Sequence, residues 1–240
     1  MRHHSSLNGY VVFPSRQMEE EWLHATSSKL PREKLANRFE ALLDSAESEQ
    51  EVHEFFEQHP QLLPGVEYYH NGPMGDVVVT KLPLGSDFVT DFAFASENSQ
   101  AVQFTCVEIE NPRQPIFDRG AQFSRGYLAA KQQLADWNQW AQQNIRQALR
   151  MFGRLGRFLP QEYYTISLEC VLVMGRRAEF NTIKRKQRWA AEYALRQASM
   201  RIMTYDRLLE RTRSECYAWD HKMLVCSYKD RALHAKRISA

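Results

Sequence analysis

Two glutamates separated by one residue, Glu108 and Glu110, have types and spacing that could do chemistry. They lie in an apolar run that is typical of a β-strand, in which successive side chains point to opposite faces. Both carboxylates therefore share one face, while Val107 and Ile109 share the other. Two carboxylates on one face repel each other at neutral pH, and a cation between them removes that cost.

A third carboxylate, Asp91, lies in the preceding predicted strand, across a hairpin from the two glutamates and near the polar end. Carboxylates from adjacent strands form a hard, oxygen-rich site that suits Mg²⁺ or Mn²⁺. Such ions can activate a water, hold a phosphate and assist the leaving oxygen, as phosphodiester hydrolysis requires. The alternative is an exposed edge strand with its polar residues in water. An E-x-E pair is a weak signal by itself, but acids seldom stand unpartnered in an apolar strand, which favours the metal site.

The elements that must position these acids are three β-like runs and one long helix. The runs cover residues 88–95, 102–110 and 166–174, and the last is the most apolar segment of the chain, typical of a buried strand. The polar residues 96–99 predict a hairpin between the first two. We expect the three strands to share one sheet, with the proline-free helix over residues 121–152 packed on it.

The remaining elements are predicted from apolar residues at helical or strand spacing. They are a short helix over residues 17–24, helices over 32–46, 49–59, 179–199 and 205–213, and short strands at 77–79 and 201–203. Ser48 is placed to cap the helix that follows it. The simplest division of the chain is a helical N-terminal segment (1–48), one α/β domain (49–215) and a C-terminal extension (216–240) that ends in a loose polar tail (229–240).

The bulk composition limits the class of protein. With 240 residues, of which 43% are hydrophobic, the chain can bury a large core. The net charge is only +2, so any nucleic-acid site must be a local patch. The four cysteines form no C-x-x-C pair and indicate reduced core thiols rather than disulfides or zinc. We expect a cytoplasmic protein, because the sequence has neither an apolar run of about 18 residues nor an apolar signal core.

One local basic patch is present. Residues 175–188 contain six basic side chains against the single acid Glu179, and Trp189 and Tyr193 follow. Such a segment can bind a phosphate backbone, with aromatic rings available for stacking. The alternative is a solvated helix face with Trp189 in the core. The basic residues are Arg176, Arg177, Lys184, Arg185, Lys186 and Arg188.

Other candidate residues carry weaker signals. His53 and His59 are six apart, which does not fit the H-E-x-x-H spacing of a metalloprotease, and we predict that both lie at the surface. An acid from an early helix, Glu54 or Glu40, is a candidate to project toward the metal site. The Gln- and Trp-rich stretch 132–143 is either a face for self-association or, more commonly for such residues, part of the core.

Several short segments, in the right order, resemble one known family. Asp91 followed by Glu108-Ile109-Glu110 resembles the signature of PD-(D/E)XK nucleases. The string VEIENP that begins at Val107 is similar to a stretch of the Shedu antiphage defence proteins, in the nuclease domain at the C-terminus of SduA. The resemblance covers roughly residues 50–210. The further segments that resemble this family are FFEQHPQLL (55–63), TDF (90–92), AKQQLADW (130–137), LVMGR (172–176) and TYDRLL (204–209).

The resemblance implies an α/β fold with a PD-(D/E)XK, restriction-endonuclease-like core, a mixed sheet flanked by helices. It also implies magnesium, DNA cleavage or nicking, and a homo-oligomer. Asp91 and Glu108 would be the metal ligands, with the carbonyl of Ile109 as a further ligand. Gln133 matches the helix glutamine that lies beside the site in that family.

One departure affects the chemistry. Glu110 stands where the signature has a lysine, as it does in a minority of restriction enzymes of this fold. We therefore retain Glu110 as a catalytic residue, as a third ligand or a water-orienting group. Lys131 could replace the lysine, but on an ideal helix it projects away from the face of Gln133.

Two hypotheses from different classes therefore stand beside each other. The first is a magnesium-dependent endonuclease of a Shedu-type defence system. The second is a catalytically silent module that binds nucleic acid or assembles while retaining the nuclease fold. A purely structural interaction protein is a third, weaker one.

Overall fold

The computed structural model describes most of the chain. The described residues are 4–6, 9–11, 31–64, 77–97, 101–153, 165–195, 199–214, 224–229 and 232–236. The helix predicted over residues 17–24 lies outside them. The first described elements are two short paired strands, β1 (His4–Ser6) and β2 (Gly9–Val11).

A seven-stranded mixed sheet forms the centre of the fold, in the order β11-β10-β3-β6-β7-β8-β9. β3 pairs antiparallel with β6, and β6 pairs antiparallel with β7. β7, β8 and β9 run parallel to one another, as do β10 and β3. The strands are β3 (Val77–Thr80), β6 (Phe92–Glu97), β7 (Ala101–Ile109), β8 (Thr165–Val173), β9 (Met200–Met203), β10 (Leu224–Lys229) and β11 (Ala232–Ala235).

The predicted hairpin is confirmed as β6 and β7, and the strand predicted over 166–174 is present as their neighbour β8, of which the second half is buried. The strand predicted over 88–95 is divided, however. Its first part, β5 (Phe88–Val89), pairs with β4 (Pro83–Leu84) in a separate two-stranded sheet. The chain then bends at Thr90 and Asp91 before β6 begins, so Asp91 lies at the end of a strand and not within one.

Alternation along the strands divides the interior into two cores, one on each face of the sheet. Phe104 and Cys106 of β7 lie in the core under the long helix α4 (Arg125–Gly153), where they meet Leu134 and Trp137. Val107 lies in the opposite core. The sequence predicted this alternation, and the predicted packing of the helix on the sheet is confirmed.

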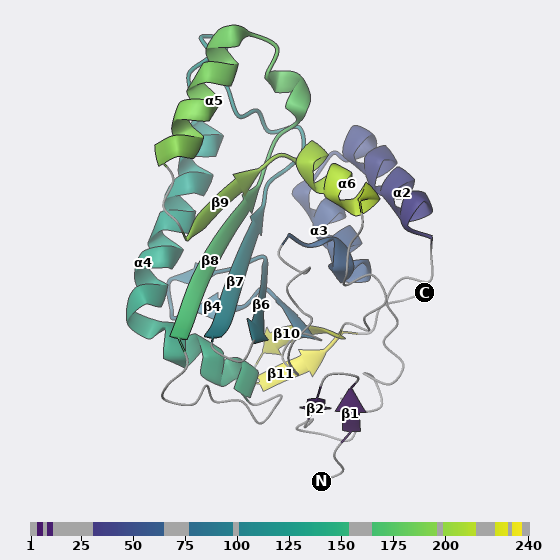
Figure 1. Ribbon diagram of the computed structural model, residues 1–240, viewed down its shortest axis with the longest axis vertical. Helices are drawn as coiled ribbons and strands as arrows, with labels where there is room; N and C mark the ends of the chain where they lie inside the picture. Colours follow the sequence, from purple (N-terminus) through teal and green to yellow (C-terminus); the bar gives the residue numbers. More distant parts are fainter. Residues whose placement is uncertain are drawn as a thin grey trace.

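Helices cover both faces of the sheet (Figure 1). α4 and α5 (Ile183–Leu195) lie on one side, and α2 (Arg32–Ser45), α3 (Glu49–Gln58) and α6 (Tyr205–Arg213) lie on the other. Two short 3₁₀ turns, η1 (Pro60–Leu62) and η3 (Arg177–Glu179), complete the described elements. The fold is therefore a mixed α/β fold with a sheet flanked by helices.

Local signals set the ends of the helices near the acids. Ser48 caps α3 in a capping box with Glu51, as predicted for Ser48. Thr204 caps α6 by accepting a hydrogen bond from the backbone N–H of Arg207. Gly175 turns the chain after β8 with φ +68°, where an added Cβ would lie 2.6 Å from Ile116. The basic helix predicted over 179–199 is shorter, because η3 and a turn precede α5.

The last described residues belong to the sheet. β10 lies beside β3, with Val225 opposite Val78, and β11 pairs with β10. The expectation of a loose tail from residue 229 is therefore wrong for the part that the structure describes, since Ala232–Ala235 is a strand. Cys106, Cys170 and Cys226 are buried free thiols, as predicted. None of the described helices combines the length and apolar character needed to cross a bilayer.

Candidate metal centre

The three acids meet where β6 begins and β7 ends. Phe92 pairs with Val107 in the antiparallel ladder, and continuing that register places Asp91 opposite Glu108. Glu110 follows directly after β7, and its backbone N–H donates to the carbonyl of Val173 on β8 (3.0 Å). The structure therefore brings together the acids that the sequence singled out.

Asp91 is held firmly, with an exposed fraction of 3%. Its Oδ2 accepts a hydrogen bond from the backbone N–H of Ile109 (2.8 Å). Its Oδ1 forms an ion pair with the Lys81 ammonium. In a strand the N–H and C=O of one residue lie on the same side, so the Ile109 carbonyl also lies on the side of β7 that faces Asp91.

Glu108 is hydrogen-bonded to α4, the helix that covers this face of the sheet. Gln133 of α4 donates from Nε2 to Oε1 of Glu108 (2.8 Å), so Gln133 lies beside the acids. Burial, with the charges of Asp91, Glu110 and Glu49 and a hydrogen bond to Asp91, raises the pKa of Glu108 to about 10. Without a bound cation this carboxyl therefore keeps its proton at neutral pH.

Glu110 lies at the more open side of the cluster. The hydroxyl of the buried Tyr205 donates to the backbone carbonyl of Glu110 (2.5 Å), which fixes the turn that follows β7. Burial, with the charges of Glu49 and Asp91, raises the pKa of Glu110 to about 7. This carboxyl therefore changes charge near neutral pH, while Glu108 does not.

The acid contributed by an early helix is Glu49, which the sequence reasoning missed. Glu49 is the first residue of α3, and burial, with the charge of Asp91, raises its pKa. The two predicted candidates lie elsewhere. Glu54 is exposed and accepts a hydrogen bond from Gln50, and Glu40 pairs with Arg213. The predicted cap at Ser48 was the signal that could have identified Glu49, because a capped helix start fixes the position of the acid in its first turn.

A lysine also belongs to the site, and it is Lys81 rather than Lys131. Lys81 follows β3, whose Thr80 pairs with Phe92, so its backbone N–H donates to the Asp91 carbonyl (2.9 Å). Burial alone would lower the pKa of Lys81, but the hydrogen bond to Asp91 and its charge raise it. Lys131 instead pairs with Glu192.

The donors present fit a hard divalent cation. Within the described part of the chain, no three His, Cys, Asp or Glu side chains gather closely enough to hold a metal by themselves. Mg²⁺, however, often takes one or two protein carboxylates and completes its shell with waters and phosphate oxygens. Asp91, Glu108 and the Ile109 carbonyl supply a set of that size. In this structure the Lys81 ammonium provides the positive charge beside Asp91.

The match to a family of known proteins covers this whole site. The family model described as Shedu protein SduA, C-terminal, matches residues 46–209, about two thirds of the chain. The chain belongs to the Shedu SduA C-terminal family. This membership implies a role in antiphage defence. No match was found among curated proteins.

The Shedu match includes the capped start of α3, all three sequence-predicted acids, Gln133 and most of α6. It also spans the basic segment after β8. The structure shows that several of those basic side chains already contact acids, backbone carbonyls or a ring of the same chain.

Arg176 pairs with Asp44 (2.9 Å) and Asp206 (3.3 Å), and Arg177 pairs with Glu210. Arg185 donates to the backbone carbonyls of Glu179 and Asp118, and the Arg188 guanidinium lies over the Phe123 ring. Lys184 and Lys186 are exposed on α5. These two lysines are therefore the members of the predicted nucleic-acid patch that solvent reaches most freely.

His53 and His59 are buried, with exposed fractions of 3% and 7%, so the prediction of surface histidines is wrong. His53 stacks on Phe92 (ring centroids 4.4 Å apart), and its Nε2 lies 3.3 Å from the Thr80 hydroxyl. Burial lowers the pKa of both imidazoles. His53 thus stays neutral and supports the strand end from which Asp91 projects. Trp137 is fully buried in the core, which is the commoner of the two alternatives considered for its helix.

Proposed function

We propose that this chain is a metal-dependent DNA endonuclease or nickase of a Shedu-type antiphage defence system, built on a PD-(D/E)XK-like core. We further propose that it acts in the cytoplasm as a homo-oligomer. The observation that carries the proposal is the approach of Asp91 and Glu108 on one face of the sheet, with Gln133 bonded to Glu108. Carboxylates held together in this way can bind the divalent ion used in phosphodiester hydrolysis. A purely structural site has no need to bring these like charges together.

Each ligand in the proposed set is oriented by a neighbour. The Ile109 N–H and Lys81 fix the Asp91 carboxylate, and Gln133 fixes that of Glu108. When bound, a magnesium ion would lower the pKa of a water and neutralise charge that develops on the phosphate. Glu108 would lose its proton on binding the ion, which makes the affinity for the metal increase with pH.

Glu110 takes the proton-transfer role in this proposal. A general base works best when its pKa lies near the working pH, and the pKa of Glu110 is raised to about 7. Tyr205 holds the backbone at this residue, which limits where the carboxylate can reach. Glu110 would therefore orient the attacking water and accept its proton.

Lys81 supplies the positive charge that the nuclease signature has at the position of Glu110. Its ammonium contacts Asp91, and the nearby charges of Glu49 and Glu108 help to raise its pKa. Its backbone φ of +51° is uncommon for a residue with a side chain, and local strain of this kind gathers at functional sites. In the proposal Lys81 stabilises charge on the phosphate.

A plasmid-cleavage assay tests the proposal directly. Supercoiled DNA is incubated with the protein and Mg²⁺, Mn²⁺ or EDTA, and nicked and linear products are separated on a gel. Cleavage should require the metal, vanish in Asp91→Asn, and persist in Asp87→Asn, a matched change at an exposed loop residue. Metal-independent cleavage, or full activity of Asp91→Asn, would contradict it.

A catalytically silent module is the second candidate, because the Lys81–Asp91 ion pair already neutralises a proposed ligand. Such a module would bind DNA in a salt-dependent manner and cut nothing with either metal. The same assay, combined with DNA binding in EDTA, separates the two functions.

A further inference from the structure

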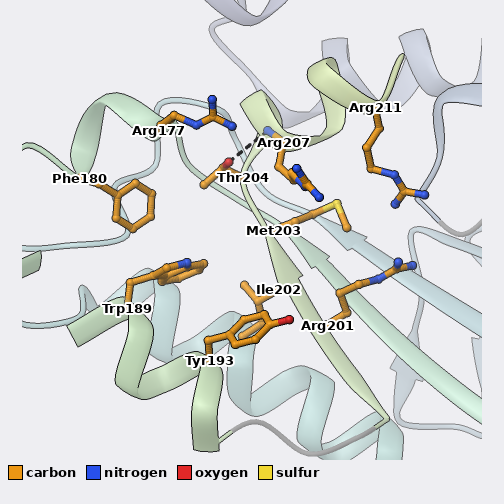
Figure 2. Close-up of a pocket in the computed structure, with 10 residues that line it drawn as sticks. All are labelled: Arg177, Phe180, Trp189, Tyr193, Arg201, Ile202, Met203, Thr204, Arg207 and Arg211. Atoms are coloured by element: carbon orange, nitrogen blue, oxygen red, sulfur yellow. Dashed lines mark hydrogen bonds between the residues drawn. The ribbon is translucent and has the colours of Figure 1, made fainter. Parts of the chain in front are cut away.

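A second concave site lies at the outer edge of the sheet, away from the three acids. It has a volume of about 640 Å³ and is formed by α5, the edge strand β9 and α6. This volume lies in the range of pockets that hold a small molecule, which is room for one or two nucleotides. Figure 2 shows the aromatic rings and Arg177 on one side of β9, and Arg201, Arg207 and Arg211 on the other.

The aromatic wall is a helix face. Trp189 and Tyr193 are four residues apart on α5, so they project side by side. Phe180 packs against Trp189 with ring centroids 5.2 Å apart, which fixes the indole. Tyr193 has an exposed fraction of 55%, a large aromatic surface for a position beside a pocket. Rings presented in this way suit stacking of a nucleobase.

The basic wall is also a helix face. Arg207 and Arg211 are four residues apart on α6, and Arg201 reaches the pocket from β9. Glu210 is shared between Arg177 and Arg207 (3.7 Å to the latter), so one carboxylate balances two guanidinium groups. The charge that remains is positive, which favours an anionic occupant.

Arg201 adds a donor that makes no hydrogen bond within the described part of the chain. It pairs with Glu169 (3.1 Å), and its side chain has an exposed fraction of 19%. Its Nε has no hydrogen-bond partner among the described residues. A buried guanidinium N–H without an acceptor is costly, and a phosphate oxygen would remove that cost.

The pocket and the acids lie near the same end of the parallel strands β7, β8 and β9. Met203 pairs with Val173, which pairs with Ile109, so two strand spacings, about 10 Å, separate the pocket from the Ile109 backbone. Thr204 lines the pocket, and the next residue, Tyr205, donates to the Glu110 carbonyl. A strand whose phosphate lies at the acids can therefore reach the pocket within one or two nucleotides.

We propose that this pocket binds an unpaired nucleotide of the substrate strand, with its base against Trp189 and Tyr193 and its phosphate against Arg201 and Arg207. The inference rests on the proposed nuclease function for the identity of its ligand. It defines substrate class, because a strand with an unpaired nucleotide beside the scissile phosphate is favoured over a continuous duplex.

The test measures binding of a fluorescein-labelled single-stranded oligonucleotide, and of the same sequence as a duplex, to the full chain in EDTA. Anisotropy should show tighter binding of the single strand. Tyr193→Leu should weaken that binding about tenfold or more, whereas Tyr193→Phe, which retains the ring, should not. The double variant Arg207→Glu, Arg211→Glu should weaken it and reduce the dependence of log affinity on log salt. The double variant Arg125→Glu, Arg146→Glu, at exposed positions of α4 outside the pocket, is the charge-matched control.

Thermal melts of each variant show whether it is folded. Single-strand affinity equal to the natural protein's in Tyr193→Leu and in the double arginine variant would overturn the proposal. So would a change in oligomeric state by sedimentation with unchanged oligonucleotide affinity, because the pocket would then hold a second copy. Since binding is measured without metal, loss of the proposed nuclease alone would leave these results intact. Active cleavage with indifferent pocket variants would refute the pocket alone.

Discussion

Replacing Glu108 by glutamine should stabilise the protein in the absence of metal while removing its response to magnesium. Glutamine has the shape of a protonated glutamate, so its carbonyl can still accept from Gln133 and its amide can still donate toward Asp91. The charged groups around the position are Asp91, Glu110, Glu49 and the Lys81 ammonium. Three of these four are acids, which is why ionisation of Glu108 is unfavourable in the folded state.

The size of the effect follows from the pKa. The pKa of Glu108 is about 10 in the folded chain against an ordinary 4.5. The folded state thus holds a proton that the unfolded chain releases above pH 4.5, and the free energy of unfolding falls as pH rises from there toward 10. At pH 7 the loss is about 3 kcal/mol, at about 1.4 kcal/mol per pH unit, reduced somewhat by the remaining solvent exposure. Glu108→Gln removes this loss.

Thermal melts in EDTA at pH 6, 7 and 8 measure the difference. A gain of about 2–3 kcal/mol corresponds to about 4–12 °C in Tm for a chain of this size, and the gain should grow with pH. Added Mg²⁺ should raise the Tm of the natural protein, more at pH 8 than at pH 6, and should change the variant less. Glu54→Gln, a change at an exposed glutamate on α3, is the matched control. A natural protein whose Tm is independent of pH, with a glutamine variant no more stable than it, would refute the placement of Glu108.

Three further predictions concern the same site and the basic patch. Glu110→Gln should nearly abolish metal-dependent cleavage with DNA binding intact, and Glu110→Lys should weaken metal binding without restoring activity; cleavage that appears only in the lysine variant would instead support the silent module. Lys81→Met should lower the cleavage rate by about a hundredfold or more in the plasmid assay, whereas Lys131→Met should not, and equal rates would remove Lys81 from the mechanism. Reversing the charges of Lys184 and Lys186 should weaken DNA binding at low salt and reduce its salt dependence; unchanged affinity would make these lysines an ordinary solvated helix face.

The sequence by itself determined which acids could meet. Strand alternation is a local property with a period of two, so Glu108 and Glu110 were assigned to one face, and Val107 to the opposite core, before any fold was known. The hairpin that brings Asp91 opposite them was equally local, because a polar turn joins its two strands. The cap at Ser48 could be predicted from the sequence for the same reason.

The tertiary structure alone decided what surrounds those acids. Lys81 meets Asp91 because β3 pairs with β6. A single lysine after a strand does not predict that pairing. His53 stands between glutamates and apolar residues in sequence, which does not show whether it is exposed, but α3 packs it onto Phe92 and buries it. Glu54 and Glu40, rather than Glu49, were predicted as the helix acid near the metal site. The reason is that the direction of an early helix relative to the sheet is set by long-range packing. β10 enters the sheet beside β3, far away in the chain. Local periodicity fixes the face on which a side chain lies, whereas pairing between distant segments fixes its neighbours, and the chemistry of this site depends on both.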